Sequence, residues 1–197
     1  MNYVFAFIAA YLLGSVSIGI LLGKRKYKTD VRLKGSGNAG ATNVARVFGL
    51  NAGLITFLGD AVKTFIALYI GSLLAGDMGV VVSGIGCLIG HCWPVFFGFK
   101  GGKGVTVSAA TSLWLDWRIF LILVATFFLV YLICKIVSLC SIVAAVMYPL
   151  AMLFLGGYNP VFFILSVFVT LYVCFMHRSN IKRLLNGTES KFKPKKN

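Results

Sequence analysis

Three short segments carry most of the residues in this chain that could do chemistry. The first, residues 35–43, reads Gly-Ser-Gly-Asn-Ala-Gly-Ala-Thr-Asn and is followed by Arg46. It contains three glycines, four hydroxyl or amide side chains and no acidic residue. Glycine lets the main chain adopt the conformations in which successive amides point at one anion. This segment therefore predicts a loop that binds phosphate.

The other two segments also combine anion donors with a histidine. In the second, His91 and Pro94 precede Gly-Gly-Lys-Gly at 101–104, and Pro94 is expected to kink or end the helix before it. The amides around Gly102, with Lys103, would then open the next helix, whose positive end can face an anion. The GxxxxGK[ST] spacing of nucleotide-binding loops is missing. In the third segment, His177 and Asn180 are spaced to share one helix face.

The composition indicates which elements must position these segments. The chain has 197 residues, of which 59% are hydrophobic and 12% charged, whereas a soluble domain carries about 25% charged residues. The apolar stretches are long and do not alternate, which favours helices over the strands of a membrane barrel. We expect an all-α polytopic membrane protein with one integral-membrane domain, residues 1–190, and a basic cytoplasmic tail, residues 191–197.

Hydropathy and charge together predict seven transmembrane helices. The expected spans are residues 3–23, 47–76, 80–99, 105–115, 119–134, 136–156 and 160–176, the fourth being short and polar. This arrangement places 17 of the 19 Lys and Arg residues on one face, seven of them in the first loop and seven after the last span. The positive-inside rule makes that face cytoplasmic, with the N-terminus outside and the C-terminus cytoplasmic.

The net charge of +14 is explained by the basic residues of the cytoplasmic face, which orient the protein and attract anionic lipid. No nucleic-acid partner is therefore predicted. The five cysteines are scattered through apolar stretches and are expected to be buried apolar side chains. Within the second span, Asp60 and Lys63 are three residues apart and are expected to form a structural ion pair. The few acidic residues do not cluster, so neither a metal site nor a cofactor is predicted.

All three segments fall on the predicted cytoplasmic face. We therefore expect one site, built between helix ends, for substrates with one or two phosphates, with the neighbouring membrane lipid able to accept an acyl chain. The segments SGNAGATN with Arg46, GHCWPVF…FKGGKGVT, and HRSNIKRLLNGTE ending at Glu189 closely resemble those of the bacterial acyl-phosphate-dependent glycerol-3-phosphate acyltransferases. The resemblance covers the whole chain and includes the order of the motifs.

The resemblance implies a reaction and a location. A fatty acyl group would pass from acyl phosphate to the 1-hydroxyl of sn-glycerol 3-phosphate, giving lysophosphatidic acid and phosphate in phospholipid biosynthesis. Coenzyme A and acyl carrier protein would not serve directly as the donor. The protein would be a multi-pass protein of the bacterial cytoplasmic membrane with its active site on the cytoplasmic face. Such a reaction needs two anions held close together and a hydroxyl aimed at a carbonyl.

On this basis we assign hypothetical roles to the polar residues. Acyl phosphate would be bound by residues of the first two segments and of the sixth span: Gly40, Thr42, Asn43, Gly102, Lys103 and Ser141. Glycerol 3-phosphate would be bound by Ser36, Arg46, His177 and Asn180. Lys103, His177 and Asn180 would be catalytic, with Lys103 stabilising developing charge. The proton of the attacking hydroxyl would go either to His177 or to a substrate phosphate, and the sequence does not choose.

Two alternatives remain at this point. Helix ends and a glycine loop would also suit a membrane transporter of organic phosphate anions, although its polar groups should then run through the membrane. A transferase that uses nucleotide-activated head groups would commonly need a metal and hence clustered acids. The oligomeric state and the acyl-chain preference are not predicted.

Overall fold

The computed structural model describes residues 1–155 and 159–195, and all of the regular structure in these ranges is helical. The prediction of an all-helical membrane protein is confirmed in this coarse sense. The elements are α1 (Asn2–Ser15), α2 (Ile18–Lys26), η1 (Val31–Leu33), α3 (Ala41–Phe48), α4 (Leu50–Cys92), η2 (Val95–Phe97), α5 (Val105–Leu115), α6 (Trp117–Cys134), α7 (Val137–Leu155), α8 (Pro160–Met176) and α9 (Arg178–Leu185).

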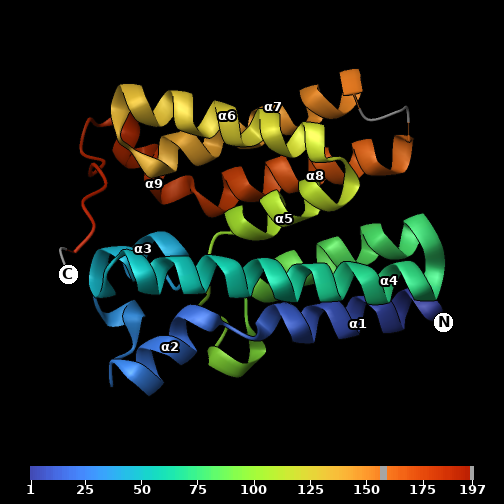
Figure 1. The fold of residues 1–197 in the computed structure, drawn as a ribbon, viewed down its shortest axis with the longest axis horizontal. Coiled ribbons are helices and arrows are strands. Elements are labelled where there is room, and N and C mark those ends of the chain that lie inside the picture. Colours follow the sequence, from blue (N-terminus) through green and yellow to red (C-terminus); the bar gives the residue numbers. More distant parts are fainter. Residues whose placement is uncertain (156–158, 196–197) are drawn as a thin grey trace.

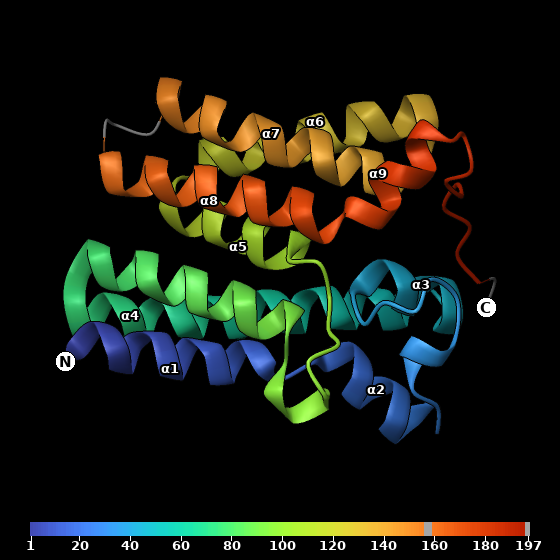
Figure 2. The ribbon, with the colours of Figure 1, turned by 180° about the vertical axis from the view of Figure 1, so that it is seen from behind.

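The helices form a layered bundle. Figures 1 and 2 show α1 lying along α4, and α5 and α8 lying between α4 and the α6–α7 pair. The N-terminus lies at one end of the bundle, whereas α3, α9 and the C-terminal tail gather at the opposite end (Figure 1). The loops on either side of α3 therefore lie away from the N-terminal end. Figure 1 shows that α4 ends and α5 begins away from that end as well.

Helix α4 is two helices joined by a sharp bend. Ala75 (φ −156°, ψ 28°) and Gly76 (φ 56°, ψ −141°) leave the helical conformation, and the chain doubles back at this point (Figure 1). The positive φ of Gly76 explains why glycine occupies the bend. Asn2 Nδ2 donates to the Leu74 carbonyl at 2.9 Å and ties the start of α1 to the bend. The two halves of α4 correspond to the second and third predicted spans.

The predicted first span, residues 3–23, is wrong as a single helix. α1 ends at Ser15 and α2 begins at Ile18, so the helix is interrupted in the middle of an apolar run. The interruption frees main-chain carbonyls that need a donor in an apolar environment. Lys63 Nζ donates to the carbonyls of Gly14, at 2.9 Å, and Val16, at 2.8 Å. A side chain from α4 therefore stabilises the break.

The other predicted boundaries vary in accuracy. α5 and α8 occupy the predicted ranges 105–115 and 160–176, and α6 and α7 agree to within two residues over the described chain. The third span was expected to reach residue 99, but α4 ends at Cys92 because Pro94 follows. Val47, the expected start of the second span, lies in α3, a helix that was not predicted. Residue 156 and the tail residues 196–197 lie outside the described residues.

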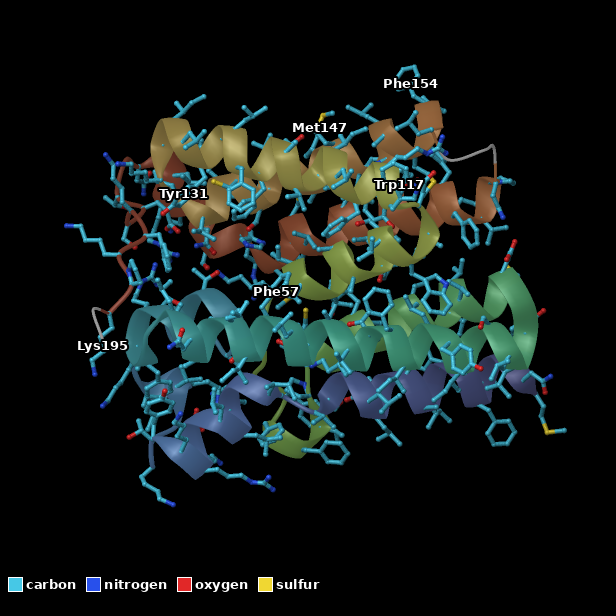
Figure 3. The ribbon with its side chains drawn as sticks, viewed as in Figure 1. Phe57, Trp117, Tyr131, Met147, Phe154 and Lys195 are labelled. Atoms are coloured by element: carbon cyan, nitrogen blue, oxygen red, sulfur yellow. The ribbon has the colours of Figure 1, made fainter. Side chains whose placement is uncertain are left out.

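The exterior of the bundle is apolar over most of its length. Figure 3 shows Met147 and Phe154 on the outer side of the α6–α7 pair, and Phe154 is 80% exposed. By length and composition, four described segments can cross a membrane, and a fifth can if α8 and α9, bent by 62°, count as one span. These segments are typical of an integral membrane protein. The seven crossings and the orientation of the termini stay predictions.

The two halves of α4 touch through glycine, which makes a direct test possible. A Cβ added at Gly79 would clash with the carbonyl oxygen of Gly71, whereas a Cβ at Gly84 would meet Leu165 at an ordinary 3.5 Å. We expect Gly79→Ala to destabilise the fold by about 1–3 kcal/mol, as overpacking does. Gly84→Ala is the matched control on the same helix and should be neutral or slightly stabilising. Thermal unfolding in detergent measures both, and equal melting temperatures would contradict this packing.

Candidate active site

One cavity of about 360 Å³ lies where the three motif segments meet. Its polar lining comes from the loop before α3, from α3, from the end of α4, from the start of α5, from α7 and from the region after α8. The polar side chains that line it are Ser36, Asn38, Thr42, Asn43, Arg46, His91, Lys103, Thr106, Ser108, Ser138, Ser141, His177, Asn180, Arg183, Glu189 and Ser190. Segments separated by more than 140 residues in the sequence therefore share one site.

The remainder of the cavity is apolar. Most of this wall comes from α6 and α7: Phe120, Leu123, Val124, Phe127, Phe128, Val137, Ala144, Ala145 and Tyr148. Phe57 contributes from α4, and Figure 3 shows it between α4 and the upper layer of helices. Along α7, the seven helical steps from Ser141 to Tyr148 cover about 10 Å, so the apolar wall extends well beyond the polar end. The lining is therefore amphipathic along its length.

The glycine loop is held in shape by two of its own amide side chains. Asn43 is buried; its Oδ1 accepts from the Ser36 amide at 2.8 Å, and its Nδ2 donates to the carbonyls of Val31, Lys34 and Asn38. Asn38 Oδ1 accepts from the Gly40 amide at 2.8 Å. Gly40 is the N-cap of α3 and, like Asn43, takes part in the internal structure of the loop.

The first turn of α3 faces the cavity with free donors. The main-chain amides of Ala41 and Thr42 donate to no acceptor in the described chain, as expected for the first residues of a helix without a side-chain cap. Both residues line the cavity. The positive end of the helix dipole adds to the attraction for an anion at this position.

The second motif is joined to the first through a single carbonyl group. Gly101 O accepts from the Ala39 amide at 3.3 Å and from Asn38 Nδ2 at 3.2 Å. Lys103 follows two residues later, and its ammonium donates to Asn180 Oδ1 in the third motif. Gly102 is placed differently from the other predicted residues, since it lines a smaller neighbouring cavity and packs against the His91 ring.

Glu189 organises the far side of the polar end. Its Oε1 accepts from Ser138 at 2.7 Å and from Asn180 at 2.6 Å, and its Oε2 accepts from Arg183 at 2.6 Å. Burial would raise the pKa of Glu189, but these hydrogen bonds and the Arg183 charge leave that pKa below its usual value. Glu189 is therefore a carboxylate that fixes α7, α9 and the tail relative to one another.

Three cations surround the polar end, and Glu189 is the acidic residue described in the lining. Removal from water lowers the pKa of Lys103 to about 8; the charge of Glu189 opposes this, while those of Arg183 and Arg46 add to it. Arg46 has no hydrogen-bond or ion-pair partner in the described part of the chain. The polar end thus carries three cations and one described carboxylate, and that carboxylate is paired with Arg183.

His177 is held as a neutral imidazole. It follows α8 and is buried, and its Nδ1–H donates to the Val173 carbonyl at 2.8 Å. Desolvation lowers its pKa to about 4; the Lys103 charge also lowers it, while the Val173 bond and the charge of Glu189 act in the opposite direction. The lone pair is therefore on Nε2, where His177 can accept a hydrogen bond.

Nine of the ten residues predicted for the site line this cavity: Ser36, Gly40, Thr42, Asn43, Arg46, Lys103, Ser141, His177 and Asn180. Their roles stay predictions. Ser141 donates its hydroxyl to the Val137 carbonyl at 2.9 Å, so it offers the cavity an oxygen acceptor in this arrangement. The sequence reasoning did not assign Ser138, Arg183 or Glu189 to the site. Glu189 could have been found as a rare acid that ends the third motif.

The fold and cavity define an integral membrane protein whose site pairs cations and helix N-termini with an apolar wall, as an amphipathic phosphate compound requires.

Known proteins similar to this chain belong to the same class. The family described as glycerol-3-phosphate acyltransferase matches residues 4–187. A glycerol-3-phosphate acyltransferase of Clostridioides difficile (strain 630) is 42% identical, with 99% of this chain and 98% of the relative covered. One of Finegoldia magna is also 42% identical, with 97% and 98% covered.

A solved structure has the same fold. It is described as PlsY (YgiH), an integral membrane glycerol 3-phosphate acyltransferase, in the glycerol 3-phosphate form. It is 35% identical and superposes with a TM-score of 0.91 over 98% of this chain and 96% of the other. The lysophosphatidic acid form of PlsY superposes with a TM-score of 0.88 at 34% identity. The chain belongs to the glycerol-3-phosphate acyltransferase family.

The lowered pKa of Lys103 leads to a pH prediction with a definite sign. An ammonium with a pKa of about 8 is charged below that pH and loses its charge as the pH rises through it. Binding of glycerol 3-phosphate should therefore weaken at or somewhat above pH 8. Lys103→Arg should remove this midpoint, because a guanidinium stays charged. Isothermal titration calorimetry from about pH 7 to 10 tests this, and an unchanged midpoint in Lys103→Arg would assign the titration to another group.

Proposed function

We propose that the protein transfers a fatty acyl group from acyl phosphate to the 1-hydroxyl of sn-glycerol 3-phosphate, releasing lysophosphatidic acid and phosphate. The observation that carries this proposal is the two-part cavity. One end offers cations and helix amides to phosphate groups, and the other end is an apolar wall suited to an acyl chain. Membership of the family, and a relative of known fold described in glycerol 3-phosphate and lysophosphatidic acid forms, support the same assignment.

The donor would bind with its phosphate at the start of α3. The free amides of Ala41 and Thr42 and the Thr42 hydroxyl can donate to phosphate oxygens, with Lys103 on the opposite side. Gly40 and Asn43 would contribute by shaping the loop, since their polar groups are already hydrogen-bonded within it. The acyl chain would then extend past Ser141 along α6 and α7.

The acceptor would bind against the third motif. Arg46 would hold the phosphate of glycerol 3-phosphate together with Ser36, and His177 and Asn180 would orient its hydroxyl groups. Lys103, assigned to the donor, and Asn180, assigned to the acceptor, are hydrogen-bonded to each other, which supports binding of the two substrates side by side. Lys103 would therefore lie between the donor and the acceptor, where it lowers the repulsion between the two anions and stabilises the charge that develops on the carbonyl oxygen.

The reaction needs a base for one proton. The attacking hydroxyl oxygen forms a bond to the acyl carbon, the bond from that carbon to the phosphate oxygen breaks, and the hydroxyl proton must leave. A His177 nitrogen with a pKa of about 4 is a weaker proton acceptor than a phosphate monoester, whose second pKa is about 6. This comparison favours a substrate phosphate as the base and His177 as a hydrogen-bond acceptor that orients the hydroxyl.

We also infer the location of the site. The termini lie at opposite ends of the bundle, as an odd number of crossings requires (Figure 1). The basic end of α2, α9 and the tail lie at the same end as α3, whose residues line the cavity. Both facts support seven spans in the bacterial cytoplasmic membrane, with the N-terminus outside and the active site on the cytoplasmic face.

A reconstituted assay tests the proposed function. Purified protein supplied with palmitoyl phosphate and glycerol 3-phosphate should form lysophosphatidic acid without added metal ion or coenzyme A, as measured by mass spectrometry. Lys103→Met serves as the inactive control, because it keeps an unbranched side chain of similar volume and removes its charge. Absence of product would overturn the proposal, and saturable uptake of glycerol 3-phosphate into vesicles without product would favour a transporter.

The assignment of Arg46 to the acceptor gives a separate prediction. Arg46→Lys keeps the charge and loses the two-pronged geometry that matches a phosphate. We expect the KM for glycerol 3-phosphate to rise about tenfold, the equivalent of one hydrogen bond to a charged group. The KM for palmitoyl phosphate should change much less. Steady-state kinetics with each substrate varied in turn measures both, and equal increases would remove Arg46 from the acceptor site.

A further inference from the structure

A buried cluster of three ionisable side chains lies behind the cavity. Asp60, Lys63 and His91 are 1%, 6% and 6% exposed. Lys63 Nζ is 2.7 Å from Asp60 Oδ1 and 3.2 Å from His91 Nδ1. Neither Asp60 nor Lys63 lines the cavity, and the proposed reaction uses none of the three side chains. Buried charges are costly, so their presence here calls for a reason beyond stability.

The geometry accounts for every proton of the Lys63 ammonium. Its three N–H groups are used by the carbonyls of Gly14 and Val16 and by His91 Nδ1, while Asp60 supplies the opposite charge. Since Nδ1 of His91 accepts this bond, a neutral His91 carries its proton on Nε2. Lys63 thus connects the break between α1 and α2 to the end of α4.

Within the second motif, His91 links the Lys63 contact to the glycines that precede Lys103. Its Nε2 edge lies directly against Gly102, where any side chain would collide with the ring. The amide of Gly102 donates to the His91 carbonyl at 3.0 Å, and the amide of Gly101 donates to the Cys92 carbonyl at 3.1 Å. Two main-chain hydrogen bonds and the packing of the His91 ring therefore hold residues 101–102 against the end of α4.

The same segment also positions the first motif, because Gly101 O accepts the hydrogen bonds from Asn38 and Ala39. A displacement of residues 101–102 would move the glycine loop and Lys103 together. We propose that Asp60, Lys63 and His91 form a positioning cluster that sets the place of the Lys103 ammonium between the two substrates. This inference rests on the proposed function and adds a requirement to it.

Replacing both charges separates positioning from charge compensation. Lys63→Met alone leaves Asp60 buried without a partner and should lower both the melting temperature and the activity. In Asp60→Asn with Lys63→Met, no buried charge remains, so the melting temperature should recover part of this loss, the remainder reflecting the Gly14 and Val16 carbonyls that have lost their donor. The kcat of this double variant should stay about 10–100-fold low, because a displacement near 1 Å at a catalytic group has an effect of that size. Both KM values should change less.

A second variant and a matched control complete the experiment. His91→Asn removes the ring from Gly102 and leaves the Lys63–Asp60 pair in place, so it should reduce kcat without a large loss of melting temperature. In a Lys103→Arg background, which should retain measurable turnover, His91→Asn should cost much less than in the parent, because both changes act through one group. Asp116→Asn with Arg118→Met removes an ion pair outside the cavity and should keep the parental kcat.

The outcomes decide between the explanations. Parental kcat in a folded double variant, or in His91→Asn, would overturn the positioning cluster and leave a structural ion pair. If the double variant does not fold, His91→Asn and its combination with Lys103→Arg decide alone, and fully additive losses would overturn the inference. Failure of the parent protein to form lysophosphatidic acid would instead refute the proposed function, so the two failures are distinguishable.

Discussion

A main-chain group freed at the end of a helix has no water to bond with in lipid, and this constraint governs the whole structure. The chain interrupts its helices after Ser15, after Cys92 and before Val105. The main-chain groups freed in this way form hydrogen bonds with one another and with a few polar side chains. Lys63 serves the carbonyls of Gly14 and Val16, and residues of the first loop donate to Gly101. The interruptions that need partners are thus gathered in one region, and the cavity with its polar end lies there.

Much of the fold follows from hydropathy, and the failures have physical causes. The ranges of α5 and α8 were predicted correctly because turn residues or charges bound each apolar run. The break at Val16–Ser17 could not be seen, because the apolar run continues through it and its stabilising partner, Lys63, is 47 residues away in the chain. α3 was missed as a helix, although Ala41, Val44, Ala45 and Phe48 have the spacing of one apolar helix face.

The polar part of the site was more predictable than its apolar part. Glycine and polar or charged residues at the ends of apolar runs can be recognised by their type, and nine of the ten residues predicted in this way line one cavity. A leucine in a membrane helix gives no comparable signal. Leu123 and Leu129 belong to the same helix, yet Leu123 is 7% exposed and lines the cavity, whereas Leu129 is 63% exposed. Only the packing of α6 against α7 distinguishes them, just as only tertiary contacts bring Ser138, Asn180 and Arg183 to Glu189.

The amphipathic lining has a consequence for how a substrate can be oriented. A phosphate group cannot enter the apolar wall without losing its hydration, and an acyl chain gains nothing among cations. A compound carrying both therefore binds in one direction, with the bond between its two parts at the boundary of the two linings. Lys103 and Ser141 lie at that boundary, and Asn180 holds Lys103 there. Lys103 is buried enough to have a lowered pKa. The same burial strengthens the electric field of its positive charge at this point, because little water remains to screen it. In the proposed reaction, orientation of the substrate and stabilisation of charge would thus arise from the same boundary.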